Sequence, residues 1–153
     1  MYPFARNPRR RNKNKAAKES AANPACCAGE SSVPERQSGD AKKTLVLLAT
    51  DRLGKGDDEL GGKIVINFIR TMKEMGDDLW RLVLLNGGVK LAVEGSEALP
   101  QLQELAGEGL GILVCGPCLK TFNLFEKKQV GELTSMLDIV TSMQMADKVI
   151  SLT

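Results

Sequence analysis

The sequence contains no histidine among its 153 residues. This absence excludes catalysis in which an imidazole activates a serine or a cysteine, and it excludes metal sites with imidazole ligands. A cysteine nucleophile in this chain must therefore be activated by backbone dipoles, by cations or by neighbouring side chains.

Long apolar runs are also missing. No apolar stretch reaches the roughly 20 residues that a membrane-spanning helix needs, and no apolar segment follows the basic N-terminus as it would in a signal peptide. We therefore expect a cytoplasmic protein that does not enter a membrane. The four cysteines are then expected to be thiols for chemistry or metal binding, because a reducing compartment does not maintain a disulfide framework.

The net charge of +2 conceals two regions of opposite sign. Residues 1–43 hold ten Lys or Arg and four Asp or Glu, which gives +6, whereas residues 44–153 hold eleven and fifteen, which gives −4. The first region lacks apolar periodicity, so we expect a disordered basic tail followed by one folded domain. We favour a solvated tail over an arm that binds nucleic acid, and we interpret Cys26 and Cys27 as incidental tail residues rather than working thiols.

The second region alternates short apolar runs with segments of helical periodicity. Such alternation with short connections predicts an α/β fold with right-handed crossovers, a mostly parallel sheet and helices on both faces. The methionines and leucines of the helices are expected to form core or an oligomer face. The strands are predicted at residues 44–50, 79–85, 111–115 and 148–152, and the helices at residues 60–75, 96–106 and 133–145, with Ser96 as the cap of the second helix.

The strand at 111–115 ends in the sequence Cys-Gly-Pro-Cys. Cys115 then lies at the carboxyl end of a buried strand, the edge at which α/β sheets collect ligands and chemistry, so we interpret it as a sulfur nucleophile. The motif also matches the thioredoxin redox signature, but only 35 residues follow Cys118, too few for that fold. The domain holds no second cysteine pair for a zinc ribbon. The alternative is two packed, inert thiols.

A glycine-rich loop follows the first predicted strand. It lacks the Gly-Lys-Ser/Thr ending of a phosphate-binding loop, and its carboxylates would repel phosphate. One interpretation is a helix cap, with Asp57 or Asp58 as the capping residue, together with a turn. The other is a pocket wall that includes Asp51, in which Lys55 attracts a sulfur-bearing anion.

The second predicted strand ends in a tight turn. Asn86, Gly87 and Gly88 suggest a backbone that closely approaches another group, and Lys90 follows with a charge that lowers the pKa of a nearby thiol. An ordinary connection between a strand and a helix explains the same residues equally well.

These residues together resemble a known family. The loop at 51–61, the stretch at 85–97, the turn with Cys115 and Cys118 and the ending at 146–152 are similar to the C-terminal DsrE-like domain of YedF proteins. YedF proteins are described as sulfurtransferase-like selenium metabolism proteins.

The resemblance covers residues 43–153 and implies a three-layer α/β/α fold with flavodoxin-like topology. It also implies a homo-oligomer, and a persulfide carried on one cysteine at a strand end, the position of Cys115. Cys118 corresponds to the second cysteine of the YedF pair. Asn123 stands where the family more often has glycine, and asparagine is the next-best residue for a left-handed turn.

YedF proteins also carry an N-terminal TusA/SirA-like domain with its own Cys-Pro motif, whereas residues 1–43 form only the basic tail. An internal relay is therefore not expected. We expect the sulfur or selenium to come from a separate donor, either a TusA-like protein or a cysteine desulfurase.

The sequence leads to one main interpretation and two alternatives. The main one is a carrier that accepts sulfur or selenium on Cys115, with Cys118 resolving the adduct and the loops at 51–57 and 86–88 walling the pocket. The alternatives are an oligomeric module that binds a ligand or partner without catalysis, and a dithiol oxidoreductase. No cofactor or metal is expected, and neither nucleic acid nor membrane is an expected partner.

Overall fold

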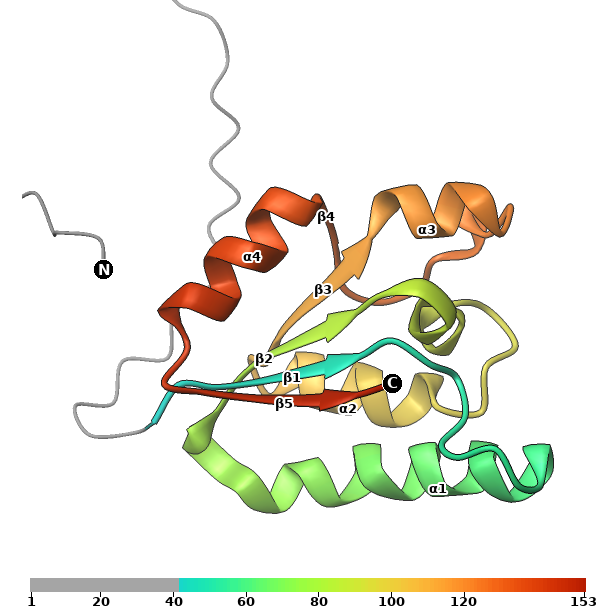
Figure 1. Cartoon of the computed structure of the whole chain (residues 1–153), viewed down its shortest axis with the longest axis horizontal. Helices are drawn as coiled ribbons and strands as arrows, with labels where there is room; N and C mark the ends of the chain where they lie inside the picture. Colours follow the sequence, from blue (N-terminus) through green and yellow to red (C-terminus); the bar gives the residue numbers. More distant parts are fainter. Residues whose placement is uncertain (1–41) are drawn as a thin grey trace, which may run out of the picture. The chain divides into compact units, whose positions relative to one another are not determined.

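The computed structural model describes residues 42–153 (Figure 1). The expectations for the basic tail, including those for Cys26 and Cys27, lie outside the described residues. The division into a tail at 1–43 and a domain at 44–153 stays a prediction.

Within the described residues, five parallel strands form one sheet in the order β4-β3-β2-β1-β5. The central strands pair in register over most of their length. The predicted α/β fold with a mostly parallel sheet is therefore confirmed. The strands are β1 (Thr44–Leu48), β2 (Leu79–Leu84), β3 (Gly111–Cys115), β4 (Glu132–Thr134) and β5 (Lys148–Leu152).

Helices cover both faces of the sheet, as predicted, with α1 and α2 on one face and α4 on the other (Figure 1). The connections from β1 to β2 and from β2 to β3 run the same way along the sheet, and right-handed crossovers place α1 and α2 on one face. The return to β5 passes over the opposite face. The helices are α1 (Asp58–Thr71), α2 (Leu99–Gly107), α3 (Gly116–Thr121) and α4 (Met136–Met145), and the 3₁₀ segments are η1 (Met72–Asp78), η2 (Asn86–Ala92) and η3 (Phe125–Lys127).

The core lies between the sheet and the pair α1 and α2. All five residues of β1 are buried, as expected for a central parallel strand covered on both faces. Val65 and Ile69 of α1 are buried, as are Leu102 and Leu105 of α2. Each such side chain contributes about 1.5–3 kcal/mol through burial. Across residues 42–153, no helix has both the length and the apolar character needed to cross a bilayer.

The last helix begins later than the sequence predicts. Residues Glu132–Thr134 form the short strand β4, and α4 starts at Met136 rather than at Leu133. The start is fixed by a capping box, in which the Ser135 hydroxyl accepts from the N–H of Asp138 and the Asp138 carboxylate accepts from the N–H of Ser135. A three-residue strand is too short to produce a period of its own, so the helical period conceals it.

The helix predicted at 96–106 starts at Leu99, and the residue before it, Ala98, provides no side-chain cap. Ser96, the predicted cap, lies one turn earlier, where its hydroxyl accepts from the N–H of Ala98 at 3.2 Å.

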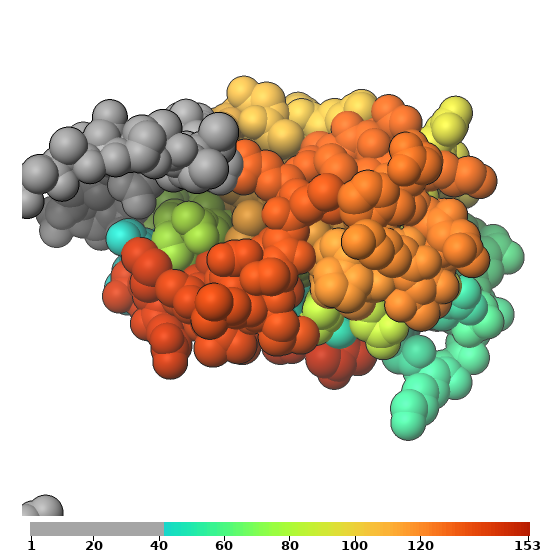
Figure 2. Space-filling model, turned by 90° about the horizontal axis from the view of Figure 1, so that it is seen from above, coloured from blue at the N-terminus to red at the C-terminus, as the bar shows by residue number. Residues whose placement is uncertain are grey.

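The apolar stripe of α4 faces solvent. The side chains that pack on the sheet are Ile139 and Ser142, whereas Leu137 is 75% exposed. Figure 2 views this face, where α4 and the α3 region lie on the sheet and dark red atoms of β5 emerge beside α4. The helical spacing correctly predicted this helix. Its apolar residues were expected to form either core or an oligomer face, and for the exposed ones on α4 the core interpretation is wrong. The exposed apolar residues on α4 are Met136, Leu137, Val140, Met143 and Met145.

Candidate functional site

The cysteine pair lies at the carboxyl edge of the sheet, as predicted. Cys115 ends β3 and is the N-cap of α3, and Cys118 lies in the first turn of that helix. Pro117 suits this first turn because its missing N–H would have no helical partner there. Both thiols are free, but their exposure differs: Cys115 is 3% exposed, while Cys118 is partly exposed.

The two thiols interact directly. Burial raises the pKa of the Cys115 thiol, and a hydrogen bond with the Cys118 side chain raises it further. A hydrogen bond from the backbone N–H of Cys118 partly offsets both effects. The pKa of Cys115 is therefore held above that of an ordinary thiol, chiefly by burial.

The predicted turn after β2 contacts this pair through its backbone. The N–H of Asn86 donates a hydrogen bond to Sγ of Cys118 at 3.3 Å. Asn86 adopts a left-handed conformation with φ of 47°, which asparagine tolerates better than most residues. A loop 32 residues away in sequence thus supplies a donor to the outer thiol.

The two glycines of this turn hold it against the end of β1. A Cβ on Gly88 would lie 2.1 Å from the carbonyl oxygen of Leu48, so that position admits only glycine. A Cβ on Gly87 would lie 3.4 Å from the N of Asp51, an ordinary contact. The close approach inferred from the sequence is therefore made to the neighbouring strand end.

Asp51 and Lys90 form an ion pair beside the turn. Nζ of Lys90 lies 3.2 Å from Oδ2 of Asp51 and 5.1 Å from the ring centroid of Phe122, which ends α3. Burial alone would raise the pKa of Asp51, but the hydrogen bond and charge of Lys90, together with a backbone hydrogen bond and the charge of Arg52, bring it below its usual range. Lys90 therefore contacts a carboxylate and a ring, and the shift of the Cys115 pKa arises from burial and from Cys118.

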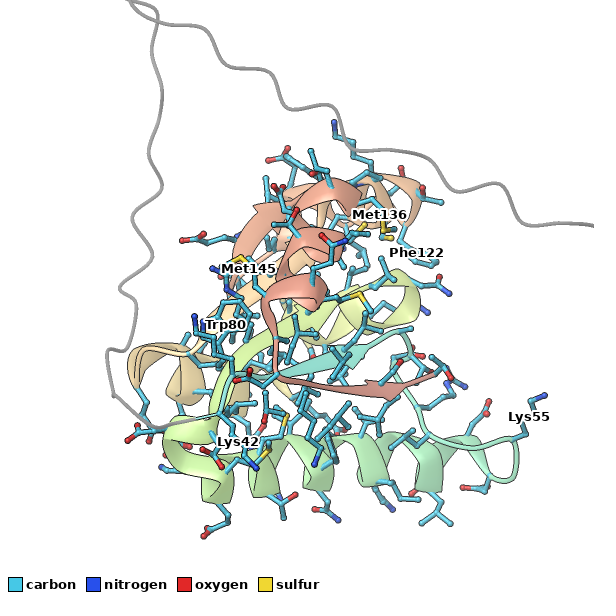
Figure 3. The ribbon with its side chains drawn as sticks, turned by 60° about the vertical axis from the view of Figure 1, so that its left-hand side comes forward. Lys42, Lys55, Trp80, Phe122, Met136 and Met145 are labelled. Atoms are coloured by element: carbon cyan, nitrogen blue, oxygen red, sulfur yellow. The ribbon has the colours of Figure 1, made fainter. Side chains whose placement is uncertain are left out.

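The structure does not bring Lys55 or Asp57 to the cysteines. Lys55 is exposed, and its side chain points away from the domain (Figure 3). Asp57 is the N-cap of α1 and accepts from the N–H of Leu60 at 2.7 Å. The capping interpretation of Asp57 is therefore confirmed. Lys55 and Asp57 therefore lie outside the site. The residues that lie at the same sheet edge as the two cysteines are Asp51, Asn86, Gly87, Gly88 and Lys90.

A hollow of about 510 Å³ lies on the far side of the ion pair. Its walls carry both signs of charge, and neither cysteine contributes to it. Among residues 42–153, no three Cys, Asp or Glu side chains are grouped to hold a metal ion. The lining includes Asp51, Asp58, Glu59, Lys63, Lys90 and Glu97.

Two residues at this edge were missed by the sequence analysis. Phe122 lies under Lys90, and Thr134 pairs with Cys115 across β3 and β4 and is buried. Both contacts join segments that are distant in sequence. No local pattern indicates them, although an aromatic residue next to a candidate site was a usable signal for Phe122.

Comparison with solved structures identifies the same fold in three proteins. The YchN protein from E. coli matches with a TM-score of 0.54 at 16% identity, over 72% of this chain and 99% of that one. MTH1491 from Methanobacterium thermoautotrophicum matches with a TM-score of 0.54 at 18% identity, over 73% and 99%. BT1422 from Bacteroides thetaiotaomicron matches with a TM-score of 0.50 at 15% identity, over 72% and 95%.

Comparison with curated proteins finds no significant match. The family comparison does: the DsrE/DsrF-like family matches residues 53–152, which include every residue gathered at the cysteine edge except Asp51. The match covers more than half of the chain. The chain belongs to the DsrE/DsrF-like family.

Proposed function

We propose that this protein is a sulfur or selenium carrier that holds a persulfide-type adduct on Cys115, within a relay linked to sulfur or selenium metabolism. The observation that carries the proposal is the contact between two free thiols at the carboxyl edge of the sheet, with a backbone N–H directed at one of them. Membership of a family linked to sulfur relay supports it. The likeness to YedF proteins motivates the selenium branch.

The chemistry requires only a thiolate and a donor persulfide. The thiolate attacks the outer sulfur of the donor, the donor S–S bond breaks, and the donor leaves as a thiolate. One S–S bond forms and one breaks, so no external oxidant or reductant is needed. A buried position such as that of Cys115 then shelters the adduct from other thiols.

The proposal includes a separate donor, either a TusA-like protein or a cysteine desulfurase. A carrier of this kind works only where its thiols stay reduced, so we place it in the cytoplasm. Its activity is that of a sulfurtransferase-like carrier.

The proposal also includes self-association. The apolar face of α4, with Met136, Leu137, Val140 and Met143, is exposed although its spacing is regular. A face of this kind on a soluble domain is typical of a protein–protein contact. A second copy packed against this face would bury the exposed apolar side chains of α4.

The test is intact mass spectrometry after incubation with a cysteine desulfurase and cysteine. We expect the chain to gain one sulfur atom, reversibly on reduction, and peptide mapping to place it on the Cys115–Cys118 pair. The variant with both cysteines changed to serine is the control and gains none at this site. Uptake confined to Cys26 or Cys27, or no uptake by thiols shown to be free, would overturn the proposal and favour a binding module.

The second candidate is a dithiol oxidoreductase, favoured by the hydrogen bond between Cys115 and Cys118. An oxidoreductase loses activity when either cysteine is changed. A carrier still takes up sulfur when one of the two thiols remains, so uptake by the single variants separates the two functions.

A further inference from the structure

We infer that Cys118 is the thiol that first receives sulfur, and that Cys115 takes it from Cys118 as the inner store. The inference rests on the proposed function and assigns an order to its two thiols. It reverses the order that the thioredoxin-like motif suggests, in which the first cysteine is the outer one.

Access decides which thiol a donor protein can reach. Attack on a persulfide needs the attacking sulfur to line up with the donor S–S bond, so both sulfur atoms of the donor must approach closely. Cys115 is 3% exposed, at the N-cap of α3 and beside the buried Thr134. Cys118 is partly exposed on the first turn of α3, so it is the thiol that meets a macromolecular donor.

Cys118 also has the better-placed donors for a negative sulfur. The N–H of Asn86 donates to its Sγ at 3.3 Å, and hydrogen bonds to a charged acceptor are stronger than those to a neutral one. The position of this N–H is fixed, because the turn lies against β1 at Gly88, where a Cβ would meet Leu48 at 2.1 Å. The donor is therefore in place before sulfur arrives.

The proton of the pair favours the same order. Burial and the contact with Cys118 raise the pKa of Cys115. At neutral pH the buried thiol is therefore a weaker nucleophile than an ordinary thiol, which favours the accessible Cys118 for the first attack.

The two steps balance. The Cys118 thiolate attacks the outer sulfur of the donor R–S–SH, the donor S–S bond breaks, RS⁻ leaves and Cys118–S–SH forms. Cys115 then loses its proton to the departing Cys118 sulfur and attacks the same outer sulfur, giving Cys115–S–SH and a Cys118 thiol. Attack on Sγ of Cys118 instead would form the Cys115–Cys118 disulfide and release HS⁻.

The experiment follows the adduct in time, in a chain whose Cys26 and Cys27 are serine so that tail thiols do not contribute. Glutathione persulfide is the probe, and the reaction is quenched, blocked and mapped by peptide mass spectrometry. We expect the earliest adduct on Cys118 and a later one on Cys115. Cys118→Ser is expected to load at least about tenfold more slowly, while Cys115→Ser traps the sulfur on Cys118.

The outcomes separate the two claims. If the starting protein takes up no sulfur, the proposed function fails. If it takes up sulfur but the first adduct is on Cys115, or Cys118→Ser loads at the starting rate, the proposed function stands and the order is overturned. The time course in the protein with both cysteines intact decides the order even if a variant folds poorly.

Discussion

The backbone N–H of Asn86 lies 3.3 Å from Sγ of Cys118 and donates a hydrogen bond to it. This contact joins the loop after β2 to the helix after β3, so two neighbouring strand ends hold one thiol between them. The inner thiol, Cys115, is buried. The two cysteines of one motif therefore have different chemical environments.

Alkylation is expected to separate them. With iodoacetamide near neutral pH, Cys118 should react at least about tenfold faster than Cys115, because access and thiolate fraction both limit the rate. Peptide mapping after short exposure measures both rates in one sample, and the urea-unfolded chain serves as the control. Equal rates in the folded protein would contradict the difference in exposure.

The pH dependence of the Cys115 reaction follows from its raised pKa. Because the folded-state pKa is above the unfolded value, the stability linked to the thiol form is present below the unfolded pKa and is lost as pH rises through the folded pKa. The alkylation profile of Cys115 should therefore lie at higher pH than in unfolded chain. In Cys118→Ala the profile should shift to lower pH, because the contact with Cys118 is lost. It should still lie at higher pH than the profile of the unfolded chain, because Cys115 remains buried.

Gly88→Ala is expected to destabilise the domain by at least about 3 kcal/mol, because the new methyl group meets a backbone oxygen that cannot move freely. Gly87→Ala is the matched control, since its Cβ makes ordinary contacts and should cost about 1 kcal/mol or less. Urea denaturation of the two variants gives the comparison. Equal losses would show that the turn does not lie against β1.

Lys90→Met should weaken the domain by about 1 kcal/mol near neutral pH, because it leaves the partly buried Asp51 carboxylate with only Arg52, whose Nε lies 3.5 Å from Oδ1. The folded-state pKa of Asp51 is lowered, so its stabilisation is present above the unfolded pKa and lost as pH falls through the folded pKa. The variant should therefore lose less stability on acidification than the starting protein.

Urea denaturation at neutral and acidic pH measures this difference. Lys63→Met is the control, because Lys63 pairs with Glu59 on the exposed face of α1, where such pairs contribute a few tenths of a kcal/mol. Identical acid profiles for all three proteins would argue against the Asp51–Lys90 pair.

Leu137→Lys is expected to convert an oligomer to a monomer, because it places a charge in the middle of the exposed apolar face of α4. Sedimentation velocity measures the state. Asn67→Lys adds the same charge at an exposed position of α1, away from this face, and should leave the assembly intact. A starting protein that is monomeric at high concentration would exclude self-association through this face.

Asn123→Gly should leave stability unchanged or slightly raised, whereas Asn123→Ala should lower it by about 1 kcal/mol. The reason is the left-handed backbone at this residue, with φ of 56°. Thermal unfolding of the two variants provides the measurement, and an alanine variant as stable as the glycine variant would contradict that conformation.

The sheet and most helices could be predicted because their signals are local. β1 is a continuous apolar run, and α1 has both an apolar period and the Asp57 cap. β4 was not predicted because three residues are too few to show a periodic pattern. The buried face of α4 was not predicted either, because an apolar stripe can pack against the sheet or against a partner protein.

The candidate site was predictable in outline for one physical reason: parallel strands bring their carboxyl ends together, so Cys115 and the turn at Asn86 had to be neighbours. The finer relationships depend on side-chain direction across segments. Sequence does not show that Cys118 faces the N–H of Asn86, or that Lys90 meets Asp51 rather than a thiol. Nor does it show Lys55 pointing outward.

The pairing of β1 with β5 has a consequence for how the chain acquires its structure. The N–H of Lys43 bonds to the carboxylate of Asp147, 104 residues away, just where Thr44 meets Lys148 across the two strands. Contacts of such long separation form late, since the loop between them must close first. During synthesis one edge of β1 therefore stays unpaired until residues 148–152 are free to pair with it.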